Sequence, residues 1–138
     1  MTIRPDDILA VAQSLALLGG EAEHRSAVSR AYYAAFHSVI DAIPQGFEPD
    51  LKGASSHEAV VSSMRAFVRE RLPGRHEAIL IADALPKLKR ERKFSDYQLQ
   101  HTVSQKDASD AIDEANKIID HCSRLMKKTQ IEVVLASN

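Results

Sequence analysis

The sequence lacks the groups on which several classes of protein depend. It has one cysteine, Cys122, so no disulfide can form within the chain, and it has no tryptophan. Its apolar runs are far shorter than the roughly 20 residues that a membrane-spanning helix needs. The first residues, from Met1 to Asp7, have no apolar stretch behind a basic start and are not typical of a secretory signal. We therefore expect a soluble, cytoplasmic protein without a partner in the membrane.

Motifs for common cofactors are also missing. The chain has no glycine-rich phosphate loop, no zinc-binding HExxH pattern and no cysteine–histidine pair at metal-ligand spacing. No two histidines lie four residues apart on a predicted helix, so we expect neither a metal site nor another cofactor. Nothing positive supports a small-molecule enzyme. The six histidines are His24, His37, His57, His76, His101 and His121.

The pattern of apolar residues predicts an all-α fold. A chain of 138 residues, 44% apolar and 27% charged, suits one domain with a sizeable core. Apolar residues recur at helical spacing throughout, which indicates an up-down bundle of four or five helices. We place one domain at 1–130 and a tail at 131–138 that either frays or packs on a partner. The helices are expected at about 5–18, 22–43, 55–72, 75–97 and 104–128.

Local signals define some helix ends and one interruption. Ser104 and Asp107 have the spacing of a capping box at the start of the last helix. Pro86 falls inside the fourth helix, where we expect a kink or a split. Residues 98–103 read as a short connection.

Charge is unevenly distributed along a chain whose net charge is only −1. Residues 1–64 have four basic and eight acidic residues, residues 65–93 have nine and four, and residues 94–138 have five and seven. The three blocks therefore have net charges of −4, +5 and −2. Such a basic block is either an ordinary solvated surface or a face that binds nucleic acid.

The apolar stripe of the fourth helix ends in an arginine. Ile81, Leu85, Leu88 and Arg92 lie on one side of this helix, and Asp96 follows Arg92 by four residues. Since an arginine is almost never buried alone, one interpretation is a salt bridge at the helix end. The other is a cation held at the edge of the core to meet an anion such as phosphate.

The second helix has two faces that differ in character. Tyr32 lies on the apolar face, whereas Arg30, Tyr33, His37 and Asp41 share another face. Adjacent residues point about 100° apart on a helix. One tyrosine can therefore belong to the core while its neighbour reaches a groove.

Three further side chains could carry chemistry, but each has a structural explanation. Cys122 lies on the apolar stripe of the last helix, where we expect a core thiol. His57, at the start of the third helix, is expected as a core or capping residue rather than a catalytic one. His101 follows the basic helix and is expected as an exposed loop histidine, although it lies close in sequence to Arg92.

Several segments together resemble the HEPN-domain family of small helical proteins. The segment Ser29-Arg-Ala-Tyr-Tyr-Ala-Ala-Phe-His37 resembles the family's second helix, and Ser56-His57 resembles the start of a following helix. Arg92-Lys-Phe-Ser-Asp-Tyr97 is similar to the family's Arg-x-x-Ala-Asp-Tyr pattern. Ser104-Gln-Lys-Asp-Ala108 follows it at the expected distance. The resemblance covers about residues 8–128 and is carried by the order and spacing of these motifs.

The resemblance implies a helical homodimer that binds RNA or a nucleotide. Many HEPN proteins are endoribonuclease toxins or phage-defence components, and many are encoded beside a nucleotidyltransferase that acts as antitoxin. Active members cleave RNA without a metal, using an arginine followed a few residues later by a histidine at the dimer cleft. Here Tyr97 stands in the place of that histidine, and His101 comes only after eight residues beyond Arg92. RNA cleavage and binding without cleavage both stay open.

The resemblance assigns roles to the residues of the basic helix. Arg92 contacts phosphate, Asp96 orients it, and Tyr97 acts as an acid or hydrogen-bond donor. Positions expected to contact nucleic acid are Arg30, Lys87, Lys89, Arg90 and Lys93. The alternative is an inert helical adaptor that pairs with a nucleotidyltransferase-type partner. Apolar residues that one bundle cannot bury favour a homodimer in either case.

Overall fold

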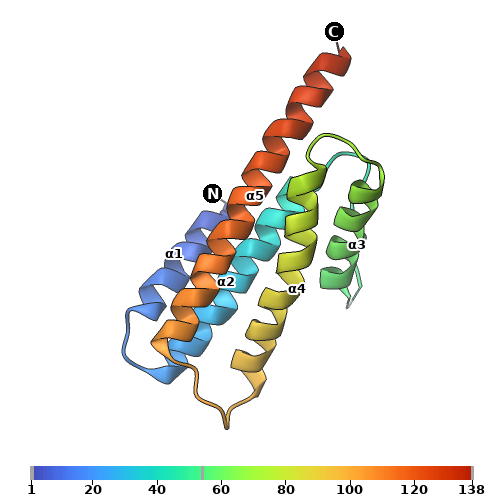
Figure 1. The fold of residues 1–138 in the computed structure, drawn as a ribbon. Helices are drawn as coiled ribbons and strands as arrows, with labels where there is room; N and C mark the ends of the chain where they lie inside the picture. The colour runs from blue at the N-terminus through green and yellow to red at the C-terminus, as the bar shows by residue number, and fades with distance from the viewer. Residues whose placement is uncertain (1, 54, 138) are drawn as a thin grey trace.

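The computed structural model describes residues 2–53 and 55–137, with side chains described through residue 130 (Figure 1). Every regular element in these ranges is a helix, which confirms the all-α prediction. No helix in the described part is both long and apolar enough to cross a membrane. The elements are α1 (Pro5–Ala16), α2 (Glu21–Ala42), α3 (Ser56–Arg69), α4 (Arg75–Tyr97) and α5 (Gln105–Ser137).

Helix α2 is the centre of the bundle. It packs against α1, α4 and α5, whereas α3 packs mainly on α4 and only slightly on α2 (Figure 1). Ala27, Ala31, Ala34 and Ala35 of α2 are fully buried. Because these side chains are only methyl groups, the neighbouring helices can approach α2 closely. The largest side chains that are fully buried come from the surrounding helices: Met64, Phe67, Ile81, Leu85, Ile118 and Leu125.

The turn between α3 and α4 depends on a glycine. Helix α3 ends at Arg69, three residues earlier than predicted, and Arg71 already has a positive φ of 55°. Gly74 has a φ of 96°, and a Cβ at this position would lie 2.6 Å from Cδ1 of Leu125. Only glycine fits both the backbone conformation and this close approach to α5.

Helix α4 continues through Pro86, so a split at this residue is wrong. A proline inside a helix leaves the carbonyl four residues earlier without its usual N–H donor. In α4 that carbonyl belongs to Ala82, and Nη2 of Arg65 on α3 donates to it at 3.3 Å. Arg65 also lies 3.6 Å from the carboxylate of Asp83. A side chain from α3 therefore replaces the missing bond and ties α3 to α4.

The start of α5 is capped as predicted. The N–H of Ser104 donates to Asp107 Oδ2 at 2.8 Å, and the N–H of Asp107 donates to Ser104 Oγ at 3.1 Å. Cys122 is a core thiol, 2% exposed, and burial raises its pKa to about 12. The backbone of α5 stays helical to Ser137. The predicted packing of the tail side chains lies outside the described residues.

The proline bond can be tested with a double-mutant cycle. Arg65→Met should lower the free energy of unfolding by about 0.5–1.5 kcal/mol, because it leaves the Ala82 carbonyl without a donor. In a Pro86→Ala background the restored N–H serves this carbonyl, so the same change should cost clearly less. Urea unfolding followed by circular dichroism measures both. Equal costs in the two backgrounds would show that Arg65 does not replace the proline's missing bond.

Candidate functional site

Arg92 occupies the position that the apolar stripe predicts. Ile81 and Leu85 are fully buried, Leu88 is 2% exposed, and the side chain of Arg92 is 13% exposed. Its guanidinium carbon lies 5.4 Å from the ring centre of Tyr32 and 5.7 Å from that of Tyr33. The negative faces of aromatic rings attract a cation at such distances. The guanidinium is thus stabilised by α2 as well as by its own helix.

Asp96 completes the environment of Arg92. Nη1 of Arg92 donates to Oδ2 of Asp96 at 3.0 Å, so the predicted pair forms within one turn of α4. Nε of Arg92 is buried and has no hydrogen-bond partner among the described residues. One N–H of a largely shielded guanidinium is therefore not used by the fold.

His57 and Tyr32 form a second polar pair beside Arg92. The hydroxyl of Tyr32 lies 2.7 Å from Nδ1 of His57, and the imidazole stacks on Phe36 with 14° between the ring planes. Burial, followed by the positive charge of Lys89, lowers the pKa of His57 below its usual 6.5. Burial raises the pKa of Tyr32. Both side chains are therefore uncharged at neutral pH. One hydrogen bond joins the hydroxyl of Tyr32 to Nδ1 of His57.

An ion pair between α3 and α4 lies beside His57. Nζ of Lys89 lies 3.0 Å from Oε1 of Glu58, one residue after His57. Three helices thus contribute to one group of side chains, which we call the Arg92 cluster. It consists of Tyr32, Tyr33, His57, Glu58, Lys89, Arg92 and Asp96.

Tyr97 stands apart from the two residues with which sequence analysis grouped it. It is 69% exposed and makes no hydrogen bond to Arg92 or Asp96 within the described part of the chain. Five positions along a helix correspond to a rotation of about 140°, so Arg92 and Tyr97 face different ways. Of the three residues assigned to catalysis, the structure brings only Arg92 and Asp96 together.

The other predicted contacts to nucleic acid lie at the surface. Lys87, Arg90 and Lys93 are exposed on α4 and form no ion pair among the residues described, whereas Lys89 belongs to the Arg92 cluster. Arg30 is exposed on α2, three residues before Tyr33 and on the same side of that helix.

Sequence reasoning identified His57 and Tyr32 separately but not as partners. The resemblance pointed to Ser56-His57 as a helix start, yet nothing local shows that its imidazole meets a hydroxyl 25 residues earlier. Their meeting depends on how α3 docks after the connection from residue 43 to residue 55. His101 is exposed, as expected.

Comparisons with protein-family models, curated proteins and solved structures gave no match to this chain. The resemblance to HEPN proteins therefore stays a prediction that rests on the quoted residues. Among the residues that the structure describes, no three histidine, cysteine or acidic side chains are placed to hold a metal ion.

The Arg92 cluster combines two kinds of chemistry. Arg92 and Lys89 are cations at the edge of the core, and the buried Nε–H of Arg92 is a donor that a phosphate oxygen would reach only once the surrounding side chains move. His57 is a neutral imidazole, so it can accept a proton at neutral pH. Asp96 and Glu58 each offset one of the two cations. This arrangement suits binding of an anion and places one proton acceptor nearby.

The electrostatic link between Lys89 and His57 can be measured directly. Lys89→Met should raise the pKa of His57 toward 6.5 without reaching it, because burial remains the larger cause of its lowering. Titration of the imidazole carbon-bound protons by NMR measures this shift. Lys87→Met removes an exposed charge two residues earlier and should leave the titration unchanged. Equal effects of both variants would contradict the link.

The same pKa makes the fold sensitive to mild acid. Because the pKa of His57 is lower in the folded chain than the usual 6.5, the unfolded chain binds the proton more tightly. The contribution of His57 to stability is therefore fully present above about pH 6.5 and is lost as pH falls from there through the lower pKa of the folded chain.

Proposed function

We propose that this chain is a HEPN-like protein that binds RNA or a nucleotide through phosphate contacts at the Arg92 cluster and the basic face of α4. The observation that carries the proposal is the unused Nε–H of Arg92, shielded by two tyrosine rings. Its basic face consists of Arg90 and Lys93, which are exposed on α4, form no ion pair among the described residues and supply attraction for a polyanion. A role in a toxin–antitoxin or phage-defence system, and assembly as a homodimer, belong to this proposal.

Metal-independent cleavage of RNA is the catalytic form of the proposal. Tyr97 faces away from Arg92, so His57 is the better candidate to move a proton, since both His57 and Arg92 contact Tyr32. Its imidazole would accept the proton of a 2′-hydroxyl while the 2′-oxygen attacks phosphorus to give a 2′,3′-cyclic phosphate, and the 5′-oxygen would leave and take a proton from water. Arg92 would stabilise the charge that builds up on the phosphorane.

An inert adaptor is the second candidate. Arg92 is 13% exposed and already paired with Asp96, which is also what a purely structural arginine would show. In this case the basic face would pair with a nucleotidyltransferase-type protein. The two candidates differ in whether Arg92 contributes to RNA affinity beyond its contribution to stability.

Salt and charge reversal test the basic face. Binding of a labelled RNA should weaken steeply as salt rises, and Arg90→Glu should lower the slope of affinity against salt by about one or more. Fluorescence anisotropy over a range of salt concentrations measures this. Lys117→Glu on α5, where the side chain is 67% exposed, is the control and should change the slope less. Binding that is independent of salt would overturn the proposal.

Arg92→Ala tests whether Arg92 binds RNA or only stabilises the fold. We expect RNA affinity to fall at least tenfold, with a loss of about 1–3 kcal/mol of stability because Asp96 loses its partner but stays partly solvated. Leu88→Ala, one turn earlier on the stripe, should cost about 2–5 kcal/mol without removing a charge. Both variants are compared under conditions in which they are folded. If Leu88→Ala weakens RNA binding as much as Arg92→Ala does, Arg92 is structural and the adaptor is favoured.

A further inference from the structure

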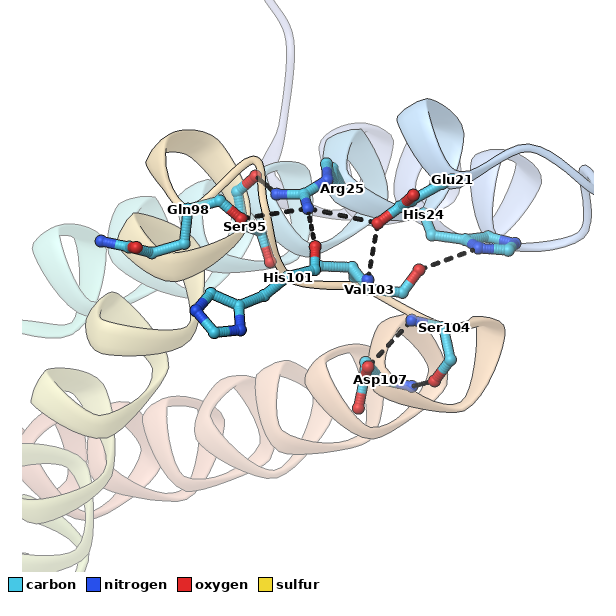
Figure 2. A network of polar contacts seen from close by, with 9 residues as sticks. All are labelled: Glu21, His24, Arg25, Ser95, Gln98, His101, Val103, Ser104 and Asp107. Atoms are coloured by element: carbon cyan, nitrogen blue, oxygen red, sulfur yellow. Dashed lines mark hydrogen bonds and ion pairs between the residues drawn. The ribbon is translucent and has the colours of Figure 1, made fainter.

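A largely shielded arginine of α2 holds the turn between α4 and α5. The guanidinium of Arg25 donates to the carbonyl of Ser95 at 2.7 Å, to that of Gln98 at 3.1 Å and to that of His101 (Figure 2). It also pairs with Glu21 at 3.2 Å, and its side chain is 12% exposed. One side chain of α2 therefore satisfies three carbonyls at the end of α4 and in the turn.

The end of the turn, at Val103, is also held by side chains of α2. Oε1 of Glu21 accepts the N–H of Val103 at 2.9 Å, and Nδ1 of His24 lies 3.4 Å from the Val103 carbonyl (Figure 2). Val103 itself is 2% exposed, and the capping box of α5 begins at the next residue. The backbone from Ser95 to Ser104 is thus fixed along its length by contacts to α2 and by the cap of α5.

This fixed backbone presents apolar and aromatic side chains to solvent. Phe94 is 39% exposed, Tyr97 69% and Leu99 73%. The ring of His101 lies 5.3 Å from that of Phe94, and its side chain points away from the Arg25 network (Figure 2). We call Phe94, Tyr97, Leu99 and His101 the α4 terminal patch. A rigid backbone that displays exposed aromatic rings is suited to contact a ligand rather than to fill a core.

Charges around the patch favour a polyanion on one side of it. Arg90 and Lys93 lie four residues before Phe94 and Tyr97, respectively, so each basic side chain neighbours one ring on α4. The side toward α5 is acidic: a groove of about 460 Å³ there is lined by Glu91, Asp107, Asp110 and Glu114, with Lys87. A phosphate backbone would follow Arg90 and Lys93 and avoid this groove.

We propose that the α4 terminal patch is a base-stacking platform for single-stranded RNA. The inference rests on the proposed function and names its substrate class. Bases of a single strand have free faces that stack on aromatic rings, whereas a duplex keeps those faces inside. Bases stack on Tyr97 and Phe94, and the linking phosphates contact Lys93 and Arg90. Tyr97 then acts through its ring and not through its hydroxyl.

The test compares single-stranded and double-stranded RNA by fluorescence anisotropy at low salt. The probes are a labelled oligoadenylate of about 15 nucleotides and a hairpin of similar length. We expect the full chain to bind the single strand at least tenfold more tightly. Tyr97→Ser and Phe94→Ser should each weaken binding by about 5- to 100-fold, while Tyr97→Phe should bind as the parent does.

Controls separate stacking from general effects. Leu72→Ser removes a side chain of matched exposure, 41%, beside the opposite end of α4 and should leave binding unchanged. Thermal melting should be nearly unaffected by Tyr97→Ser, because that side chain is mostly solvated. If Tyr97→Phe is as weak as Tyr97→Ser, the hydroxyl matters and the stacking platform is wrong.

The outcomes distinguish this inference from the proposed function. RNA binding that Arg92→Ala removes but Tyr97→Ser and Phe94→Ser leave unchanged overturns the platform and retains phosphate binding. A parent chain that binds neither RNA at low salt overturns both. If that chain also forms a dimer that Tyr97→Ser dissociates in sedimentation, the patch is occupied by a second copy of the chain instead.

Discussion

The architecture depends on how closely three helices can approach α2. Four fully buried alanines on this helix provide the space in which α1, α4 and α5 pack. Tyr32 lies between two of these alanines, at Ala31 and Ala34, and is 3% exposed, so its ring belongs to the core. The close packing leaves the hydroxyl at the edge, where it must find a partner. His57 is that partner.

The guanidinium of Arg92, on α4, also needs partners because the fold shields it from water. A shielded cation has lost much of its hydration and is stable only where other groups replace the water. The two tyrosine rings and Asp96 do this. Since these contacts already hold the guanidinium in place, an anion that meets Nε does not have to order a flexible side chain. Under the proposed function, packing of the core and preparation for binding therefore involve the same atoms.

Features that lie within a few helical turns could be predicted from the sequence. The helical pattern, the stripe that leads to Arg92, its pair with Asp96 and the cap at Ser104 are all of this kind. The pair of Tyr32 and His57 could not be predicted, because it depends on how α3 docks. Tyr97 is a different case: counting about 100° per residue already separates it from Arg92. The HEPN resemblance and the function it implies stay predictions.

The bond between Arg65 and the Ala82 carbonyl has a consequence for how firmly α3 is held on α4. Helix α3 packs mainly on α4, and among the described residues its polar ties to α4 are made by Arg65, Glu58 and the Val68 carbonyl, which accepts from Nε of Arg75. A helix that contacts mainly one neighbour can open locally, and here such opening would also expose the buried side chains of Val60, Met64 and Phe67. Detachment of α3 would carry His57 away and leave the Tyr32 hydroxyl open to water. Access to the space beside Arg92 would then be governed by a local equilibrium, whose position depends partly on the proline that exposes the Ala82 carbonyl.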